Sequence, residues 1–159
     1  MSFMTEGIVW EHYIDLPSGL GEQALAQIEG RLSGTLPEAI REVVLTRAGQ
    51  VTTPEVLRMA HGRETSFGPI LYAGGTKSHD RYSYSVEAEI SHLECWSGQR
   101  IEDLKLFPFA TNTARGHFCV ELDNPVKPIV FVDFDYDPEE IGAVWHVADD
   151  FASLLSRLS

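Results

Sequence analysis

Acidic side chains are the residues of this sequence whose number and spacing could do chemistry. Nine of them lie between residues 120 and 150 against a single lysine, and the whole chain carries a net charge of −12. An electrostatic field of that sign attracts basic partners and repels nucleic acids and anionic membranes. We therefore expect a basic macromolecule as partner, and neither nucleic acid nor membrane. The alternative is that the charge merely keeps the protein soluble.

Seven of these acids are our candidate partner-binding residues. They lie on or just after two segments, 117–123 and 129–136, whose alternating apolar and polar residues predict two half-buried strands. Because successive side chains of a strand point to opposite faces, we predict a sheet with one apolar and one acidic face. The alternative is a solvated sheet face without a partner. The candidates are Glu121, Asp123, Asp133, Asp135, Asp137, Glu139 and Glu140.

The aspartates at 133–137 match two known motifs in part and complete neither. The aspartate pair of haloacid-dehalogenase-type phosphatases requires Thr or Val where Asp137 stands. It also requires a doubly wound fold that the 22 residues after Asp137 cannot supply. A calcium loop of the EF-hand type requires Gly and Glu where Pro138 and Val144 stand. A looser, weak divalent-ion site at these acids stays open as an alternative.

Two histidines and two cysteines form the other set of candidate ligands. They occur as His92-x-x-Cys95 and His117-x-Cys119. Structural zinc sites usually contain a closely spaced cysteine pair, which this chain lacks. We therefore interpret the cysteines as small core residues and the histidines as surface or hydrogen-bonded residues, and we expect no metal.

Sequence motifs for catalysis are absent. The chain has no Gly-x-Ser-x-Gly, no P-loop and no dinucleotide fingerprint. We therefore expect a protein that binds without catalysing a reaction and that needs no cofactor. A pocket in which Asp133 or Asp135 meets His117 with strongly perturbed pKa values would instead indicate an enzyme.

Helical periodicity marks three segments of the chain. Apolar residues recur at helical spacing over 19–32, and Pro37 opens a second helix whose buried stripe runs to Ala48. Asp149 and Asp150 open a closing helix, where carboxylates favour the positive end of the helix dipole.

Strand signals fill most of the remaining chain. Residues 1–17 are expected to form an N-terminal arm or strand, and further strands are expected within 51–59, at 67–72 and at 144–147. A turn at 73–75 and an exposed loop at 76–80 follow the second of these. Residues 82–97 are ambiguous, because 82–90 alternate as a strand does while apolar residues from Val86 onward also fit a helix. The order predicts a single α+β domain over residues 1–159 with a mostly antiparallel mixed sheet, two N-terminal helices and a closing C-terminal helix.

The chain also carries indications of its compartment. It has two cysteines, 24 positions apart, an N-terminus without a basic flank, and no apolar run of about 20 residues. A cytoplasmic location is therefore expected.

Four motifs, in order over 28–158, are similar to those of the SUKH superfamily. These motifs mark the ends of helices, a tight turn and rows of buried apolar residues, so the resemblance implies a SUKH-like fold. It also implies a helix at 85–97, which we adopt. The motifs are Ile28-Glu29 with Leu36-Pro37-Glu38 and Ala48-Gly49; Leu106 to Ala110 with Gly116 and Glu121 to Asp123; Pro128 to Asp133; and Val147 to Phe151 with Leu154, Leu155 and Leu158.

The resemblance implies a binding function. The superfamily includes bacterial immunity proteins, which act in the cytoplasm and neutralise a toxin domain, often a nuclease, by direct contact. It also includes a fungal cell-wall assembly regulator. Our expectation is an immunity protein with a basic toxin domain as partner, and the alternative is a regulatory interaction module without a toxin partner.

Overall fold

The main sheet of the protein has four antiparallel strands in the order β5-β6-β7-β8. We describe it from a computed structural model that covers residues 7–16, 21–59, 62–74 and 84–159. Each strand is joined to the next in sequence, so the sheet is a simple meander. The strands are β5 (Leu106–Thr111), β6 (His117–Glu121), β7 (Ile129–Val132) and β8 (Val144–Ala148).

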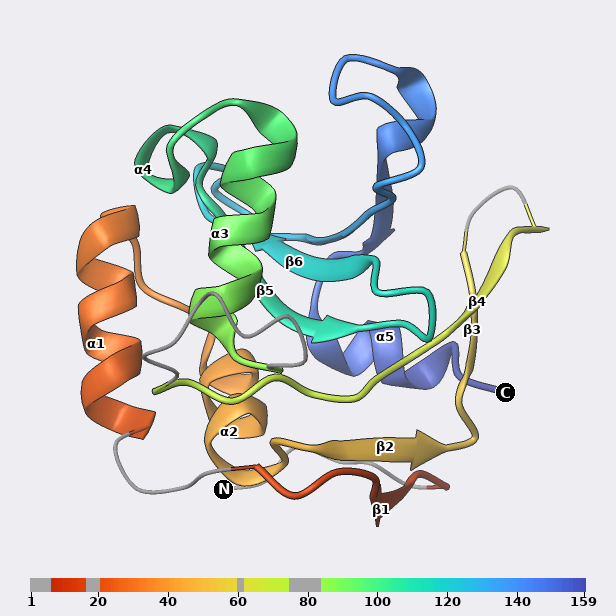
Figure 1. The fold of residues 1–159 in the computed structure, drawn as a ribbon. Coiled ribbons are helices and arrows are strands. Elements are labelled where there is room, and N and C mark those ends of the chain that lie inside the picture. Colours follow the sequence, from red (N-terminus) through yellow and green to blue (C-terminus); the bar gives the residue numbers. More distant parts are fainter. Residues whose placement is uncertain (1–6, 17–20, 60–61, 75–83) are drawn as a thin grey trace.

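Helices cover both faces of this sheet. In Figure 1, α3 crosses one side of β5 and β6, and α5 lies on the other side. The two predicted N-terminal helices and the closing helix are confirmed, and the α+β class with them. No described helix is long and apolar enough to cross a membrane. The helices are α1 (Gly21–Leu32), α2 (Glu38–Thr46), α3 (Val86–Ser97), α4 (Ile101–Leu104) and α5 (Phe151–Ser156).

The helix adopted for 85–97 is present as α3. Ser85 is its N-cap, and the Ser85 hydroxyl accepts a hydrogen bond from the Ala88 backbone N–H at 3.0 Å. Gly98 ends the helix with a φ of 70°, a left-handed conformation that glycine adopts without strain. The alternation over 82–90 was therefore misleading as a strand signal, and residues 82 and 83 lie outside the described part of the chain.

Two small sheets flank the main one. In the first, β1 (Val9–His12) pairs with β2 (Gln50–Thr53), which agrees with the N-terminal arm or strand that we expected. In the second, β3 (Val56–Arg58) pairs with β4 (Glu64–Ser66). Together β2 and β3 fulfil the strand prediction within 51–59.

The strand predicted at 67–72 is wrong. This segment is buried and makes only isolated bridges, from Ile70 to Ala110 and from Tyr72 to Ser85. Pro69 has no backbone N–H to donate, and the left-handed Gly68 before it breaks the strand geometry. The predicted loop at 76–80 and the end of the turn at 75 lie outside the described residues.

The predicted acidic face of the sheet is also wrong. In β6 and β7, Phe118 lies opposite Phe131, and Cys119 lies opposite Val130. Paired residues of an antiparallel sheet point to the same face. Apolar side chains of β6 and β7 therefore lie on both faces of the sheet. Helix α3 buries those on one face, and α5 buries those on the other. The second predicted strand, 129–136, ends at Val132, and the acids that follow lie in a loop.

An aromatic cluster fills the core on the α5 side. The ring of Phe67 lies 5.1 Å from that of Phe118, and the ring of Phe109 lies 5.8 Å from that of Phe151. All four side chains are buried. Their contacts tie the segment after β4, the sheet and the closing helix together, so α5 is part of the core.

Candidate functional site

The connection between β7 and β8 is the most acidic exposed feature of the described chain. We call residues 133–143 the acidic loop; it rises from the body as the blue loop at the upper right of Figure 1. Four of its five acids are exposed, and these are Asp135, Asp137, Glu139 and Glu140. The loop thus collects negative charge at a position that another macromolecule can reach.

An ion pair holds the base of the acidic loop. The carboxylate of Asp133 accepts a hydrogen bond from Arg63, with 2.5 Å between Oδ2 and Nη2. The guanidinium of Arg63 also lies 5.0 Å from the centre of the Trp145 ring. The backbone N–H of Asp133 donates to the Ala143 carbonyl at 2.8 Å, which closes the loop. Its two ends are therefore fixed to each other and to the residue that precedes β4.

Hydrogen bonds within the acidic loop fix its turns. The backbone N–H of Asp135 donates to Oδ1 of Asp133 at 3.0 Å. Further along, the N–H of Asp137 donates to Oε1 of Glu140 at 2.8 Å, and the N–H of Glu140 donates to the Asp137 carbonyl at 2.9 Å. The carboxylates of Asp133 and Glu140 thus hold the turns of the loop. The loop therefore loses less conformational entropy when a partner binds.

Helix α3 supports the acidic loop from the side. The indole N–H of Trp96 donates to the Tyr136 carbonyl at 2.9 Å. The ring of Phe134 stacks on His92 at 4.2 Å between centroids, and it meets the Trp96 ring edge-on at 5.3 Å. The loop is therefore braced by a helix that lies about 40 residues earlier in the sequence.

An exposed isoleucine stands at the tip. The Ile141 side chain is 97% exposed, which is extreme for a large apolar residue. Tyr136 and Val144 nearby in the sequence are also exposed, at 38% and 39%. Apolar groups surrounded by charge on a fixed loop are typical of the centre and rim of a protein interface.

The seven candidate residues occupy two ends of the sheet. Glu121 ends β6 and Asp123 lies in the turn to β7, whereas the acidic loop begins where β7 ends. Glu121 and Asp123 are thus separated from the acidic loop by the length of β7. Asp133 is only 8% exposed and is paired with Arg63, so its charge is balanced inside the protein. The exposed cluster consists of the four remaining candidates.

A recess opens beside the acidic loop. It has a volume of about 90 Å³, and Asp135 lies on its wall together with Arg63, Phe131, Asp133 and Phe134. This space is below the 300 to 1,000 Å³ of a typical small-molecule site. It has room for one side chain. Because Arg63 balances the charge of Asp133, the carboxylate that favours a basic side chain there is that of Asp135.

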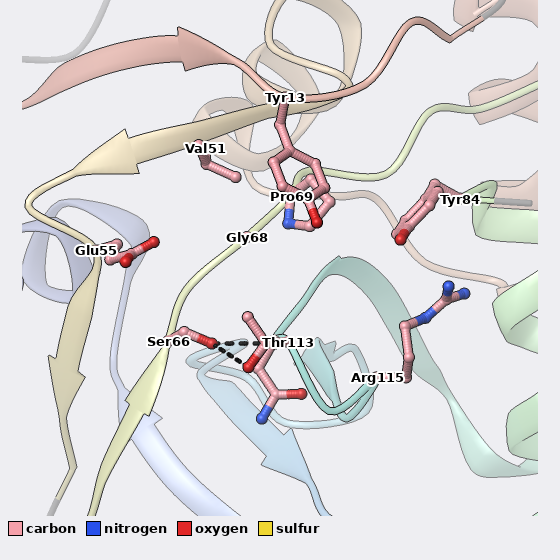
Figure 2. A pocket seen from close by; sticks show the side chains of 10 residues that line it. Tyr13, Val51, Glu55, Ser66, Gly68, Pro69, Tyr84, Thr113 and Arg115 are labelled. Atoms are coloured by element: carbon pink, nitrogen blue, oxygen red, sulfur yellow. Dashed lines mark hydrogen bonds between the residues drawn. The ribbon is translucent and has the colours of Figure 1, made fainter. Parts of the chain in front are cut away.

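A second recess lies between β2 and the turn that joins β5 to β6. Figure 2 shows Tyr13, Pro69 and Tyr84 in the upper part of the view, and Ser66, which is hydrogen-bonded to Thr113, below them. Its volume is about 100 Å³, again the size of one side chain. The guanidinium of Arg115 lies 4.3 Å from the centre of the Tyr84 ring and closes one side.

Beneath the acidic loop lies a buried polar cluster. Glu89 of α3 and His117 of β6 are hydrogen-bonded to each other, and Arg115 Nη2 lies 3.2 Å from the other carboxylate oxygen of Glu89. The carboxylate that meets His117 is thus that of Glu89, not that of Asp133 or Asp135. His92, one turn along α3 from Glu89, is exposed, and its ring lies 5.4 Å from the His117 ring.

Burial and pairing perturb the pKa values in this cluster. Burial raises the pKa of Glu89, but the hydrogen bond to His117 and the positive charge of Arg115 outweigh it, so the pKa lies below 4.5. Burial lowers the pKa of His117 below 6.5, and the hydrogen bond to Glu89 offsets this only in part. At neutral pH the pair therefore consists of a carboxylate and a neutral imidazole.

The two cysteines have different surroundings. Cys119 is buried, as we expected, and burial raises the pKa of its thiol well above 9.0. It is therefore neutral and unreactive at neutral pH. Cys95 is exposed at the outer side of α3, so its interpretation as a core residue was wrong.

The helix pair, the meander and the closing helix define an α+β domain that carries four exposed acids on one braced loop. The chain belongs to the SMI1 / KNR4 family (SUKH-1), whose model matches residues 19–157. This confirms the resemblance to the SUKH superfamily. Comparison with curated proteins gives no match, and no solved structure matches either.

Proposed function

We propose that this protein is an immunity protein that binds and neutralises a toxin domain through its acidic loop. Membership of the SMI1 / KNR4 family supports an immunity or interaction module. The single observation that carries the proposal is the tip of the loop, where a 97% exposed isoleucine stands among acids on a braced backbone. In this role the protein acts in the cytoplasm and binds its partner without transforming it.

The chemistry of the loop indicates a basic partner. Asp135, Asp137 and Glu139 are exposed and project a negative field, which accelerates association with a positively charged surface. A nuclease domain has such a surface because its active site holds a polyanion, so an acidic loop can occupy the place of the substrate. The recess lined by Asp135 then accepts a basic side chain, and Ile141 supplies the apolar anchor.

Charge reversal in the loop tests the electrostatic part of the proposal. The triple variant Asp135→Lys, Asp137→Lys, Glu139→Lys leaves the Asp133 and Glu140 hydrogen bonds in place. We expect its association with the toxin domain encoded beside this gene to be at least about tenfold slower at low salt. The control reverses three exposed acids elsewhere, Glu11, Glu22 and Asp103. Equally slow association of both variants would show that only net charge matters. Unchanged association kinetics of the loop variant would exclude the loop from the interface.

Truncation of the tip tests the apolar part. We expect Ile141→Ala to weaken the complex about thirtyfold, mainly through faster dissociation, as at an interface hot spot. The matched control is Val126→Ala, because Val126 is also exposed, at 63%, and lies in the turn between β6 and β7. Growth of cells that express the toxin domain should be rescued by wild type and by the control, and poorly by Ile141→Ala.

The alternative function is a regulatory interaction module without a toxin partner. Family membership supports it equally, because the family model matches without regard to the partner. Co-purification from the native host distinguishes the two. Capture of a toxin domain supports immunity, and capture of a regulatory protein, with no protection against the neighbouring toxin domain, supports the alternative.

A further inference from the structure

We propose that Glu89, His92 and His117 form a binding site for a divalent transition-metal ion, with zinc as the best candidate. One ligand atom from each side chain lies within 4.8 Å of the other two. The group combines two histidines with a carboxylate, a set of donors that nothing in the partner-binding function requires. It lies beneath the acidic loop and does not depend on the proposed immunity function.

Secondary structure places the three ligands on two facing elements. Glu89 and His92 are three residues apart on α3, so their side chains leave the same face of the helix. A Glu-x-x-His pair at this spacing is a metal-binding arrangement in helical bundles. His117 faces them from β6, where it is fully buried. Two rigid elements thus hold the ligands, which is what a defined coordination geometry needs.

The donor types select the class of metal. Imidazole nitrogen with one carboxylate oxygen suits zinc and its neighbours cobalt and nickel, whereas calcium and magnesium require mainly oxygen ligands. Three protein ligands leave a fourth tetrahedral position for water. Ligand atoms of a tetrahedral site with bonds of about 2.1 Å lie roughly 3.4 Å apart, so the group must contract. His92, the exposed member of the group, makes that movement by sliding along the Phe134 ring on which it is stacked.

One of the two ring nitrogens of His117 is bound within the group, because Nε2 meets the carboxylate of Glu89. Among the described residues, Nδ1 of His117 is buried and has no hydrogen-bond partner. The imidazole is therefore held only through its other nitrogen, where Glu89 lies. A metal ion at Nε2 takes the place of the ring proton, which moves to Nδ1. Because Nδ1 has no acceptor among the described residues, this shift favours moderate over tight affinity.

The surroundings of the group both support and weaken a metal site. Arg115 hydrogen-bonds the other oxygen of Glu89 and so orients the carboxylate, as outer-shell partners of metal ligands do. Its positive charge also repels a cation, which favours moderate over tight affinity. Phe134 stacks on His92 and meets His117 edge-on, so it covers the group from the side of the acidic loop.

Cobalt and zinc titrations of the full chain test the proposal. We expect one equivalent of Co²⁺ to give the visible absorption of a four- or five-coordinate ion, and Zn²⁺ to displace it. His92→Ala should weaken Zn²⁺ binding by at least about tenfold in calorimetry. His92 is exposed, and the Glu89–His117 pair survives its removal, so the variant should fold. Circular dichroism checks this.

The control variant is His146→Ala. His146 is an exposed histidine beside a carboxylate, Asp149, at 3.0 Å, but it lies on β8. Loss of affinity in His92→Ala together with wild-type affinity in His146→Ala supports the site. Equal affinity in wild type and His92→Ala, or only the weak spectrum of six-coordinate aqueous Co²⁺, overturns it and leaves Glu89 and His117 as a structural pair.

Discussion

Arg63 and Asp133 form an ion pair across 70 residues of sequence, and this pair fixes the base of the acidic loop. The Asp133 carboxylate uses one oxygen for Arg63 and the other for the backbone N–H of Asp135. The residue therefore stabilises the loop that carries its exposed acidic neighbours. Among the seven acids selected from the sequence, Asp133 is thus a supporting residue of the loop.

The first prediction concerns this pair. Asp133→Ala should lower the free energy of unfolding by about 2 kcal/mol, because it leaves Arg63 half-buried and without its carboxylate. The control, Asp135→Ala, removes an exposed acid of the same loop and should change stability by less than about 0.5 kcal/mol. Urea denaturation of both variants measures the difference. Equal stabilities would mean that the ion pair does not hold the loop.

A second prediction compares two glycines. A Cβ atom at Gly116 would lie 2.5 Å from the Phe131 ring and 3.0 Å from the Val132 carbonyl oxygen. Gly116→Ala should therefore destabilise the protein by about 2 kcal/mol through overpacking. Gly30 on α1 has nothing within 4 Å of such an atom, so Gly30→Ala should stabilise by about 0.5 to 1 kcal/mol. Thermal denaturation should move the two midpoints in opposite directions, and a shared direction would contradict the packing described.

The third prediction concerns the dependence of stability on pH. The pKa of His117 is lowered in the folded protein, so the unfolded chain binds a proton more readily. Stability should therefore decrease as the pH falls below about 6.5. Protonation of Glu89, whose pKa is also lowered, should remove further stability below about pH 4.5. Both groups act in the same direction on acidification.

Replacement of His117 isolates its contribution to the pH dependence of stability. His117→Gln keeps an N–H that can donate to Glu89 but cannot titrate. Between about pH 7.5 and pH 5.5 its stability should fall less steeply than that of wild type. His146→Gln, which replaces an exposed histidine, should follow the wild-type curve. A wild-type slope in the His117 variant would place the titrating group elsewhere.

The fourth prediction concerns the start of α5. The carboxylate of Asp150 accepts a hydrogen bond from the Ser153 backbone N–H at 2.8 Å, and this bond lowers the pKa of Asp150 below 3.8. Asp150→Ala should cost about 1 kcal/mol at neutral pH, as loss of an N-cap does. The difference from wild type should disappear as the pH falls through the folded pKa, where the carboxylate is protonated. Asp149→Ala, one residue earlier and exposed, should have a much smaller effect.

Local signals were enough to predict α1, α2 and α5. Pro37 is the N-cap of α2 and Asp150 is that of α5, and both act within one turn of their own position. Recognition of the helix at α3 needed the family motifs, because its first residues also alternate. The order of helices and antiparallel strands followed from these elements, so the fold class was predictable.

Contacts between distant segments were not predictable in this way. Alternation shows which residues of a strand share a face, but the pairing register decides which faces of two strands meet. In the observed register Phe118 lies beside Phe131, so the sheet has no acidic face of the predicted kind. Arg63 gave no signal as the partner of Asp133. The one signal for Ile141 was an apolar residue within an otherwise polar turn, and its exposure became clear only from the structure.

The way in which the acidic loop is held has a consequence for how its specificity can change. Its shape depends on Asp133, Glu140 and backbone atoms, together with the indole groups of Trp96 and Trp145. The side chains at 135, 137, 139 and 141 contribute little to that framework. They can therefore be exchanged as a set, by natural divergence or by selection from a small library, while the rest of the fold serves as a constant scaffold.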